Sequence, residues 1–254
     1  MVPWNHCFSD AQIPSNPPAS KLSRARRLHR HNYERMLALF GERPIWLRSA
    51  LQSHFPEFTL GEFRALLPAV AWHMVDGPWR TCWIRYGYDP KSNSDGAQYQ
   101  VVELRNQHAH AIVEAFPASL KKLSEASNRH VFDGLQLVPS LSQFQYCDLT
   151  FPPLRRLLSD PSSLRGEIDR REGWYVDGTV SQIRKIIKER WMELVRQADP
   201  QFYELALKIM NKAAISSKES SVGGDAVEEL EEYLADLAKE EEEGNEEEYE
   251  YFDE

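Results

Sequence analysis

The residue types that most often do chemistry are sparse in this sequence and poorly spaced for catalysis. No segment matches GxSxG, GxxxxGK[ST], GxGxxG or HExxH, the patterns of common nucleophile, phosphate and zinc sites. The pairs His29/His31 and His108/His110 lack a Cys or carboxylate cluster at ligand spacing, which favours solvated or core histidines over metal ligands. Cys82 lies between aromatic residues in a β-rich run, which favours a small core residue over a nucleophile. We therefore expect no enzyme activity, metal, cofactor or small-molecule substrate.

Lysine and arginine offer a different chemistry, because a nucleic-acid duplex presents closely spaced phosphates that bind cations converging from several elements. The candidates for DNA contact in this sequence are Arg43, Arg48, Arg64, His73, Arg80, Arg85, Lys91 and Arg105. In a helix-turn-helix, the second helix enters the major groove while the first crosses the backbone. Arg64 and His73 fall on the second helix of the predicted helix-turn-helix, so we expect them to contact base edges. The candidates for phosphate contact are Arg48, Arg80, Arg85 and Lys91.

Helical spacing of apolar residues predicts the elements that lead up to these cations. Residues 21–40 are predicted to be helical and end at Gly41 as C-cap. The start of this segment is basic, with Lys21, Arg24, Arg26, Arg27 and Arg30. A second helix is expected to start at Pro44 and to end before Pro56.

A third predicted helix follows within a few residues. Thr59-Leu-Gly-Glu62 has the pattern of a capping box, with Thr59 as N-cap and Glu62 as the third helical residue. The apolar stripe after it continues to Met74, with Pro68 expected to kink or split the helix and Gly77 to stop it. Two helices joined by so short a turn are typical of a helix-turn-helix.

A β hairpin is predicted directly after the helices. Residues 79–86 are rich in β-formers, residues 89–96 (DPKSNSDG) are turn formers throughout, and residues 99–105 (YQVVELR) return as a second strand. The predicted fold class is mainly α with a small antiparallel β hairpin. The predicted architecture is a winged helix-turn-helix with a helical C-terminal extension.

The chain is expected to comprise four parts. These are an extended N-terminal segment at 1–20, a winged-helix domain at 21–108, a helical and irregular extension packed on it at 109–215, and a linker with an acidic tail at 216–254. The extension includes a helix from Thr179 whose basic side is a candidate second binding surface or simply a solvated face. That side carries Arg184, Lys185, Lys188 and Arg190. The tail has a narrow apolar stripe that could dock a helix, formed by Val227, Leu230, Leu234 and Leu237.

Composition narrows the class of protein. The three cysteines are dispersed and include no CxxC pair, which points to a reducing compartment rather than a disulfide framework. No stretch approaches 18 apolar residues, so we expect no membrane contact.

The net charge of −9 combines two opposite parts. Residues 225–254 hold 16 Asp and Glu against one Lys, a balance of −15. The remaining residues hold 29 Lys and Arg against 23 Asp and Glu, a balance of +6. A basic body tethered to an acidic tail predicts that the tail competes with DNA for the basic surface. A tail that only solubilises the protein is the alternative.

Several segments resemble the C-terminal DNA-binding region of a transcription factor IIIC subunit from the tau-A lobe. The specific ones are RPIWLRSAL (43–51), LLPAVAWHM (66–74), GPWRTCWIRYGYDP (77–90) and YQVVELR (99–105). Weaker similarity extends through HVFDG (130–134), YCDLTFPPLRRLL (146–158) and EGWY (172–175).

The resemblance implies a winged helix, a nuclear location, no enzyme activity, and contact with the A box of transfer-RNA genes within a multisubunit RNA polymerase III factor. Family members carry an N-terminal region that pairs with a partner subunit, so we expect this chain to correspond to a fragment. The expected partners are double-stranded DNA and other subunits of that factor. The alternative is a protein-interaction module whose acidic tail engages a basic partner.

Overall fold

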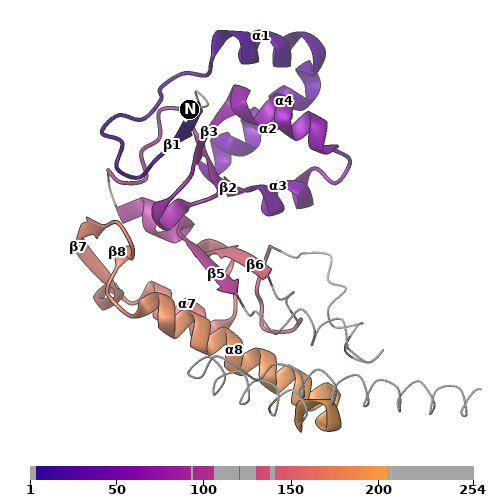
Figure 1. Cartoon of the computed structure of the whole chain (residues 1–254), viewed down its shortest axis with the longest axis vertical. Helices are drawn as coiled ribbons and strands as arrows, with labels where there is room; N and C mark the ends of the chain where they lie inside the picture. The colour runs from indigo at the N-terminus through magenta and orange to yellow at the C-terminus, as the bar shows by residue number, and fades with distance from the viewer. Residues whose placement is uncertain are drawn as a thin grey trace, which may run out of the picture. The chain divides into compact units, whose positions relative to one another are not determined.

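The computed structural model describes residues 4–92, 94–105, 120, 130–137, 141–204 and 207 (Figure 1). The chain divides into two compact units. The first comprises Met1–Leu104, Ala126–Val138 and Ser142–Trp191, and the second comprises Arg105–Glu125, Pro139–Leu141 and Met192–Glu254. The first unit holds every site described below. Much of the predicted extension at 109–215 and the whole predicted tail stripe lie outside the described residues.

Two helices occupy the basic segment that was predicted to form one. α1 (Ala19–Leu28) and α2 (Arg30–Glu42) are separated at His29, whose φ of −139° and ψ of 36° are not helical. Gly41 is not the C-cap, because α2 continues to Glu42 and Arg43 takes the capping position in an extended conformation. That extended residue leads the chain directly into the next strand.

The predicted helix at Pro44 begins later than expected. Residues Ile45–Leu47 form strand β2, and α3 spans only Arg48–His54. β2 pairs antiparallel with β4 (Cys82–Arg85), with Ile45 opposite Ile84. All three residues of β2 are buried, and a continuous apolar run is as typical of a buried strand as of a helix.

The capping box predicted at Thr59 is confirmed. The Thr59 hydroxyl accepts a hydrogen bond from the Glu62 amide at 3.2 Å, and the Glu62 carboxylate accepts one from the Thr59 amide at 2.9 Å. These bonds satisfy two backbone donors that would otherwise lack partners at the start of α4 (Leu60–Val70). Pro68 lies within the last turn of α4 rather than splitting it, and the helix ends two residues later.

The apolar stripe beyond α4 belongs to a strand, contrary to the prediction. β3 (Ala71–Met74) pairs antiparallel with β4, with Trp72 opposite Ile84. On its other side β3 pairs in parallel with β1 (Asn5–His6). Trp72 is almost fully buried, and its position suits either a helical or a strand pattern. The pairing with β4 decides between them.

The predicted hairpin between residues 79–86 and 99–105 is wrong. The four-stranded sheet has the order β1-β3-β4-β2, so both edges of β4 are already occupied. The hairpin partner of β4 is β3, and residues 75–81 connect the two strands, including the short 3-10 helix η1 (Gly77–Trp79). β5 (Val101–Arg105) instead neighbours β6 (Leu141–Gln145) in a separate two-stranded sheet. The turn-forming residues 89–96 lead into η2 (Ser94–Tyr99) rather than forming a hairpin tip.

The rest of the described chain is short elements and one long helix. The short elements are η3 (Tyr146–Asp148), α7 (Pro152–Ser159), η4 (Pro161–Ser163) and the antiparallel pair β7 (Leu164–Asp169) and β8 (Gly173–Tyr175). The helix predicted from Thr179 is confirmed as α8 (Thr179–Ala198). A core that includes Phe40, Trp72 and Trp79 joins the helices to the four-stranded sheet.

Candidate nucleic-acid interface

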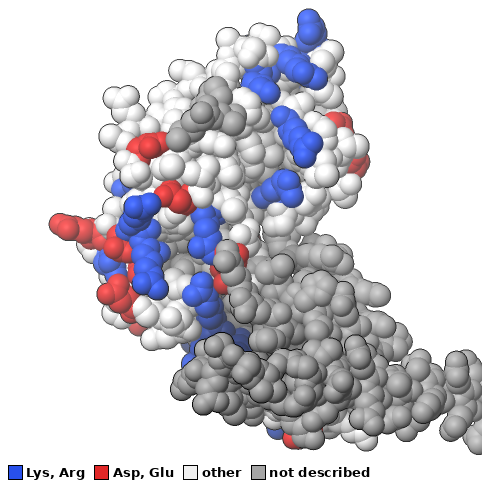
Figure 2. All heavy atoms as spheres, in the orientation of Figure 1, with Lys and Arg blue, Asp and Glu red and all other residues white. Residues whose placement is uncertain are grey.

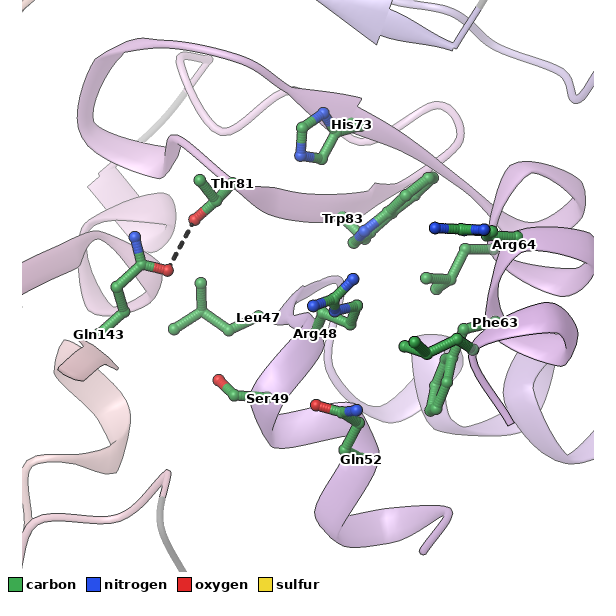
Figure 3. A pocket seen from close by; sticks show the side chains of 12 residues that line it. Leu47, Arg48, Ser49, Gln52, Phe63, Arg64, His73, Thr81, Trp83 and Gln143 are labelled. Atoms are coloured by element: carbon green, nitrogen blue, oxygen red, sulfur yellow. Dashed lines mark hydrogen bonds between the residues drawn. The ribbon is translucent and has the colours of Figure 1, made fainter. Parts of the chain in front are cut away.

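A hollow of about 440 Å³ lies between the two helices α3 and α4 and the β3–β4 hairpin (Figure 3). Its lining includes Arg48 and Gln52 from α3, Phe63 and Arg64 from α4, His73 and Trp83 from the hairpin, and Gln143 from β6. The hollow is therefore lined by two arginines, two amides and two aromatic rings. The arginines can bind an anion, and the rings can contact an apolar or planar group.

Arg48 and Arg64 are the two exposed cations of this hollow. Arg48 is the first residue of α3, and Arg64 lies in the second turn of α4. Figure 3 shows both side chains pointing from their helices toward Trp83. Neither forms an ion pair with any residue that the structure describes. Both charges are consequently available to an external anion.

His73 reaches the hollow from a strand and not, as predicted, from the second helix. Its ring lies 5.1 Å from that of Trp83, centroid to centroid, at an angle of 45°. Burial lowers the pKa of His73 below its ordinary value of 6.5, because a charged imidazole would be poorly solvated there. At neutral pH this residue therefore offers one hydrogen-bond donor and one acceptor rather than a positive charge.

Thr81 adds a strained backbone position to the same hollow. Its φ of 66° lies in the left-handed region, which a β-branched residue rarely adopts. Its hydroxyl lies 3.0 Å from the side-chain oxygen of Gln143 and 2.6 Å from the carbonyl of Arg80 (Figure 3). Sequence reasoning identified neither Thr81 nor Gln143, since backbone strain and a partner 62 residues away leave no local pattern.

Arg43, a predicted DNA contact, lies in an internal polar cluster. Its guanidinium donates to the Asp148 carboxylate at 2.8 and 2.9 Å and to the Gln145 side-chain oxygen at 2.6 Å. It also stacks over the Trp46 ring, with 4.2 Å to the centroid. Only 15 % of the side chain is exposed. This placement assigns Arg43 to holding the fold together, and we leave it out of the proposed interface.

Arg85 and Lys91 are also engaged with backbone carbonyls of this unit. The Arg85 guanidinium donates to the carbonyls of Phe40 and Gly41 at the end of α2, at 3.2 and 3.4 Å. The Lys91 ammonium donates to the carbonyls of Phe8 and Asp10, at 3.0 and 2.7 Å, and so fixes the N-terminal segment.

The other predicted cations differ in how many hydrogen bonds and ion pairs they form within the protein. Arg80 pairs with Glu103, and the Arg105 side chain is outside the described part of the chain. On α8, Arg184 donates to the carbonyl of Glu103 at 3.1 Å and Arg190 to that of Gly134 at 2.6 Å. The exposed cations of that helix include Lys188 and Lys185, and Lys185 lies 3.8 Å from Glu189.

Residues 3–105 match the RNA polymerase III transcription factor (TF)IIIC subunit HTH domain, Tau95. This segment is a TFIIIC-subunit helix-turn-helix domain. The wider chain is 30 % identical to the transcription factor tau subunit sfc1 of Schizosaccharomyces pombe over 181 residues, covering 71 % of this chain and 37 % of that protein. It is 25 % identical to the human general transcription factor 3C polypeptide 5, covering 79 % of this chain and 49 % of that protein.

A solved structure, Sfc1-DBD, matches with a TM-score of 0.62 and 27 % identity, covering 81 % of this chain and 97 % of that one. The similarity therefore extends well past the TFIIIC-subunit helix-turn-helix domain itself. The chain spans less than half the length of the two relatives above.

No group of three or more potential metal ligands occurs among the residues that the structure describes. Among the same residues, no helix combines the length and the apolar character needed to cross a bilayer. Among the groups described above, the exposed Arg48 and Arg64 of the hollow are the best suited to bind an anionic partner.

Proposed function

We propose that this chain binds double-stranded promoter DNA, in the A-box region, as part of an RNA polymerase III general transcription factor in the nucleus. The observation that carries the proposal is the pair Arg48 and Arg64, exposed at one hollow on the two helices of a TFIIIC-subunit helix-turn-helix domain. The names of the relatives and of the matching structure support it.

We propose further that this domain is a winged helix. The order helix α2, strand β2, helices α3 and α4, and strands β3 and β4 is the order in which a winged helix alternates its elements. In this assignment the wing is the β3–β4 connection at residues 75–81, and not the segment 89–96. The hollow then separates the recognition helix α4 from the wing.

The proposed contacts follow from this geometry. Arg64 and His73 are the candidates for base edges, since they line the hollow beside α4. Arg48, at the start of the first helix, is the candidate for a phosphate. Arg80 and Arg105 are secondary candidates for phosphate contact. So is the basic surface of α8, on which Lys188 is exposed.

Salt titration of duplex binding tests the proposal. The full chain is measured on an A-box duplex and on a scrambled duplex between 50 and 200 mM salt, a range over which six to ten phosphate contacts cost about 10³–10⁵-fold in affinity. Arg64→Ala should weaken A-box binding by about 1–3 kcal/mol and reduce the preference for the A box. Arg48→Ala should weaken binding to both duplexes and lower the salt slope by about 1.

The matched control is Arg156→Ala, which removes an exposed arginine from α7 without touching the hollow. A salt-independent affinity, or equal losses from all three variants, would reject the proposed interface.

The acidic tail is proposed to compete with DNA for the basic surface, on the strength of its charge of −15 against +6 for the rest of the chain. Tethering raises its local concentration near that surface. Removal of residues 224–254 should therefore tighten DNA binding. A tail of equal length with Gln in place of Asp and Glu separates charge from bulk, and binding that stays unchanged after removal contradicts the competition.

A protein-interaction role is the second candidate, and the acidic tail with its interspersed aromatic residues is the observation that favours it. The double charge reversal Arg48→Glu/Arg64→Glu separates the two functions. A DNA-binding chain loses duplex affinity, whereas a protein-interaction module retains capture of a purified basic subunit through its tail.

A further inference from the structure

Helix α1 carries a concentration of positive charge that the proposed interface does not include. Its sequence ASKLSRARRL contains Lys21, Arg24, Arg26 and Arg27. No acidic residue occurs in the whole stretch between Asp10 and Glu34. The basic part of α1 therefore runs from Lys21 to Arg27 without an acidic neighbour in the sequence.

Arg24, Arg26 and Arg27 are all exposed, and two of them, Arg24 and Arg27, share one helical face. They are three residues apart and therefore neighbours on one helical face, whereas Ala25 is fully buried. Both side chains are exposed, and no ion pair with a described residue involves either of them. By contrast, the next cations along the chain, Arg30 and Arg35, pair with Glu34 and Glu57.

The remaining two cations of α1 are held in place by aromatic rings. The Lys21 ammonium lies 4.6 Å from the centroid of the Trp4 ring, and the Arg26 guanidinium lies 5.9 Å from that of Tyr33. A ring face attracts a cation without neutralising it. These contacts fix the positions of the charges and leave the face of α1 positive.

The position of α1 connects this charge to the proposed interface. α1 packs directly against α4, the helix that carries Arg64. Figure 2 shows Lys and Arg side chains over α1 and, below it, over α4 and α3 on the same face of the molecule. Positive charge therefore lies on α1 as well as at the hollow, and α1 is a helix of ten residues and roughly 15 Å.

We propose that α1 is a second phosphate-contact surface, which extends the bound duplex beyond the segment that α3 and α4 contact. The inference rests on the proposed function and adds a separate surface to it. A duplex carries one phosphate per roughly 3.4 Å along each strand, and the cations from Lys21 to Arg27 span roughly 9 Å of helix, which is enough to reach two or three of them. Arg24 and Arg27 would contact phosphates and no base edges. α1 therefore adds to the affinity for DNA without adding sequence preference.

The test uses the full chain with Arg24→Gln/Arg27→Gln, both exposed positions, measured on A-box and scrambled duplexes. The expected result is a loss of about tenfold on both duplexes, an unchanged ratio between them, and a salt slope lower by about 2. Duplexes shortened progressively from each end give a second readout. At one end, the affinity of the wild type should begin to fall at a greater duplex length than that of the variant, because only the wild type contacts the added length.

Two matched variants make the result specific. Arg155→Gln/Arg156→Gln removes the same charge from exposed positions on α7 and should leave affinity within about twofold of the wild type. Arg48→Gln/Arg64→Gln reports on the hollow. If that variant loses affinity while the α1 variant does not, the inference fails and the proposed function stands. If only the α1 variant loses affinity, the hollow is not the interface, and the inference fails together with the proposed function, because α1 then extends no contact made by α3 and α4.

The acidic tail is the competing occupant of α1. If the tail occupied α1 and DNA did not, Arg24→Gln/Arg27→Gln would tighten DNA binding in the full chain and change nothing after removal of residues 224–254. Either of these results would overturn the inference. Unfolding temperatures of all variants are compared with the wild type, so that an affinity loss is not mistaken for unfolding.

Discussion

Arg43 and Asp148 form an ion pair at 2.8 Å although 105 residues separate them in the sequence. The pair joins the residue between α2 and β2 to the end of η3. Gln145 reinforces the same contact, because its side-chain oxygen accepts from both Arg43 and the Leu47 amide. The helix-turn-helix segment and the later part of the first unit are therefore held together by a small buried polar cluster.

Breaking this ion pair should destabilise the protein strongly. Arg43→Met leaves the Asp148 carboxylate buried without its partner, which costs about 3–5 kcal/mol in the free energy of unfolding. Urea unfolding followed by tryptophan fluorescence measures the loss. The double variant Arg43→Met/Asp148→Leu should recover part of it, since no buried charge is left alone. Equal destabilisation by Arg43→Met and by the exposed control Arg48→Met would contradict this role.

Gly173 should not tolerate a side chain. Its φ is 68°, and a Cβ atom there would collide with the side-chain amide of Gln100. That amide is fixed by two bonds, accepting from the Trp174 amide at 2.7 Å and donating to the Glu172 carbonyl at 2.9 Å. Gly173→Ala should therefore cost about 2–3 kcal/mol by thermal or urea unfolding. Gly166→Ala is the control, because no described residue other than its chain neighbours lies within 4 Å of its Cβ position, and it should change stability by less than about 0.5 kcal/mol.

His73 should make the fold less stable in mild acid. Burial keeps its folded-state pKa below 6.5, so the unfolded chain binds the proton first as the pH falls. Stability is therefore lost between pH 6.5 and the lower folded-state pKa, and His73→Gln should lessen that loss. The NMR titration of the His73 ring gives the folded-state pKa directly. A midpoint at or above 6.5 would show that the ring is not desolvated. His130 shifts in the same direction, so the single variant is needed to isolate His73.

Thr81 is a position where glycine should be tolerated without the usual loss. Glycine adopts a φ of 66° readily, and Thr81→Gly therefore relieves strain while removing the contact with Gln143. We expect the free energy of unfolding to stay within about 1 kcal/mol of the wild type. Duplex affinity should fall, because residues 75–81 lose the side chain that fixes them beside the hollow. A large loss of stability would show that the hydroxyl contact outweighs the strain.

The parts of the fold that could be predicted from sequence are those fixed by neighbours along the chain. The capping box at Thr59 and Glu62 is a local pattern, and so is the apolar face of α8. β3 was missed because Trp72 and Met74 suit two periodicities, and pairing with β4 decides which one applies. The hairpin was misassigned because β5 has a partner, β6, that follows it by more than 35 residues.

In the candidate site, too, local sequence identifies the residues, and tertiary contacts decide their roles. Sequence identifies Arg43, Arg85 and Lys91 as cations, but their partners are Asp148, Phe40 and Phe8, between 45 and 105 residues away. Whether a cation is available to DNA therefore depends on tertiary contacts that no local pattern encodes. Arg48 and Arg64 stayed available because no carboxylate of the described chain reaches them.

The parallel pairing of Asn5 and His6 with β3 has a consequence for solubility. β1 covers the outer backbone of β3, and Lys91 anchors the segment that follows it. A shortened chain starting at residue 11 would leave the amides and carbonyls of β3 without partners along one side. Such an open sheet edge recruits strands from neighbouring molecules. The segment that contains β1 should therefore prevent self-association through this edge. A chain that lacks its first ten residues should precipitate or form oligomers at concentrations where the intact chain does neither.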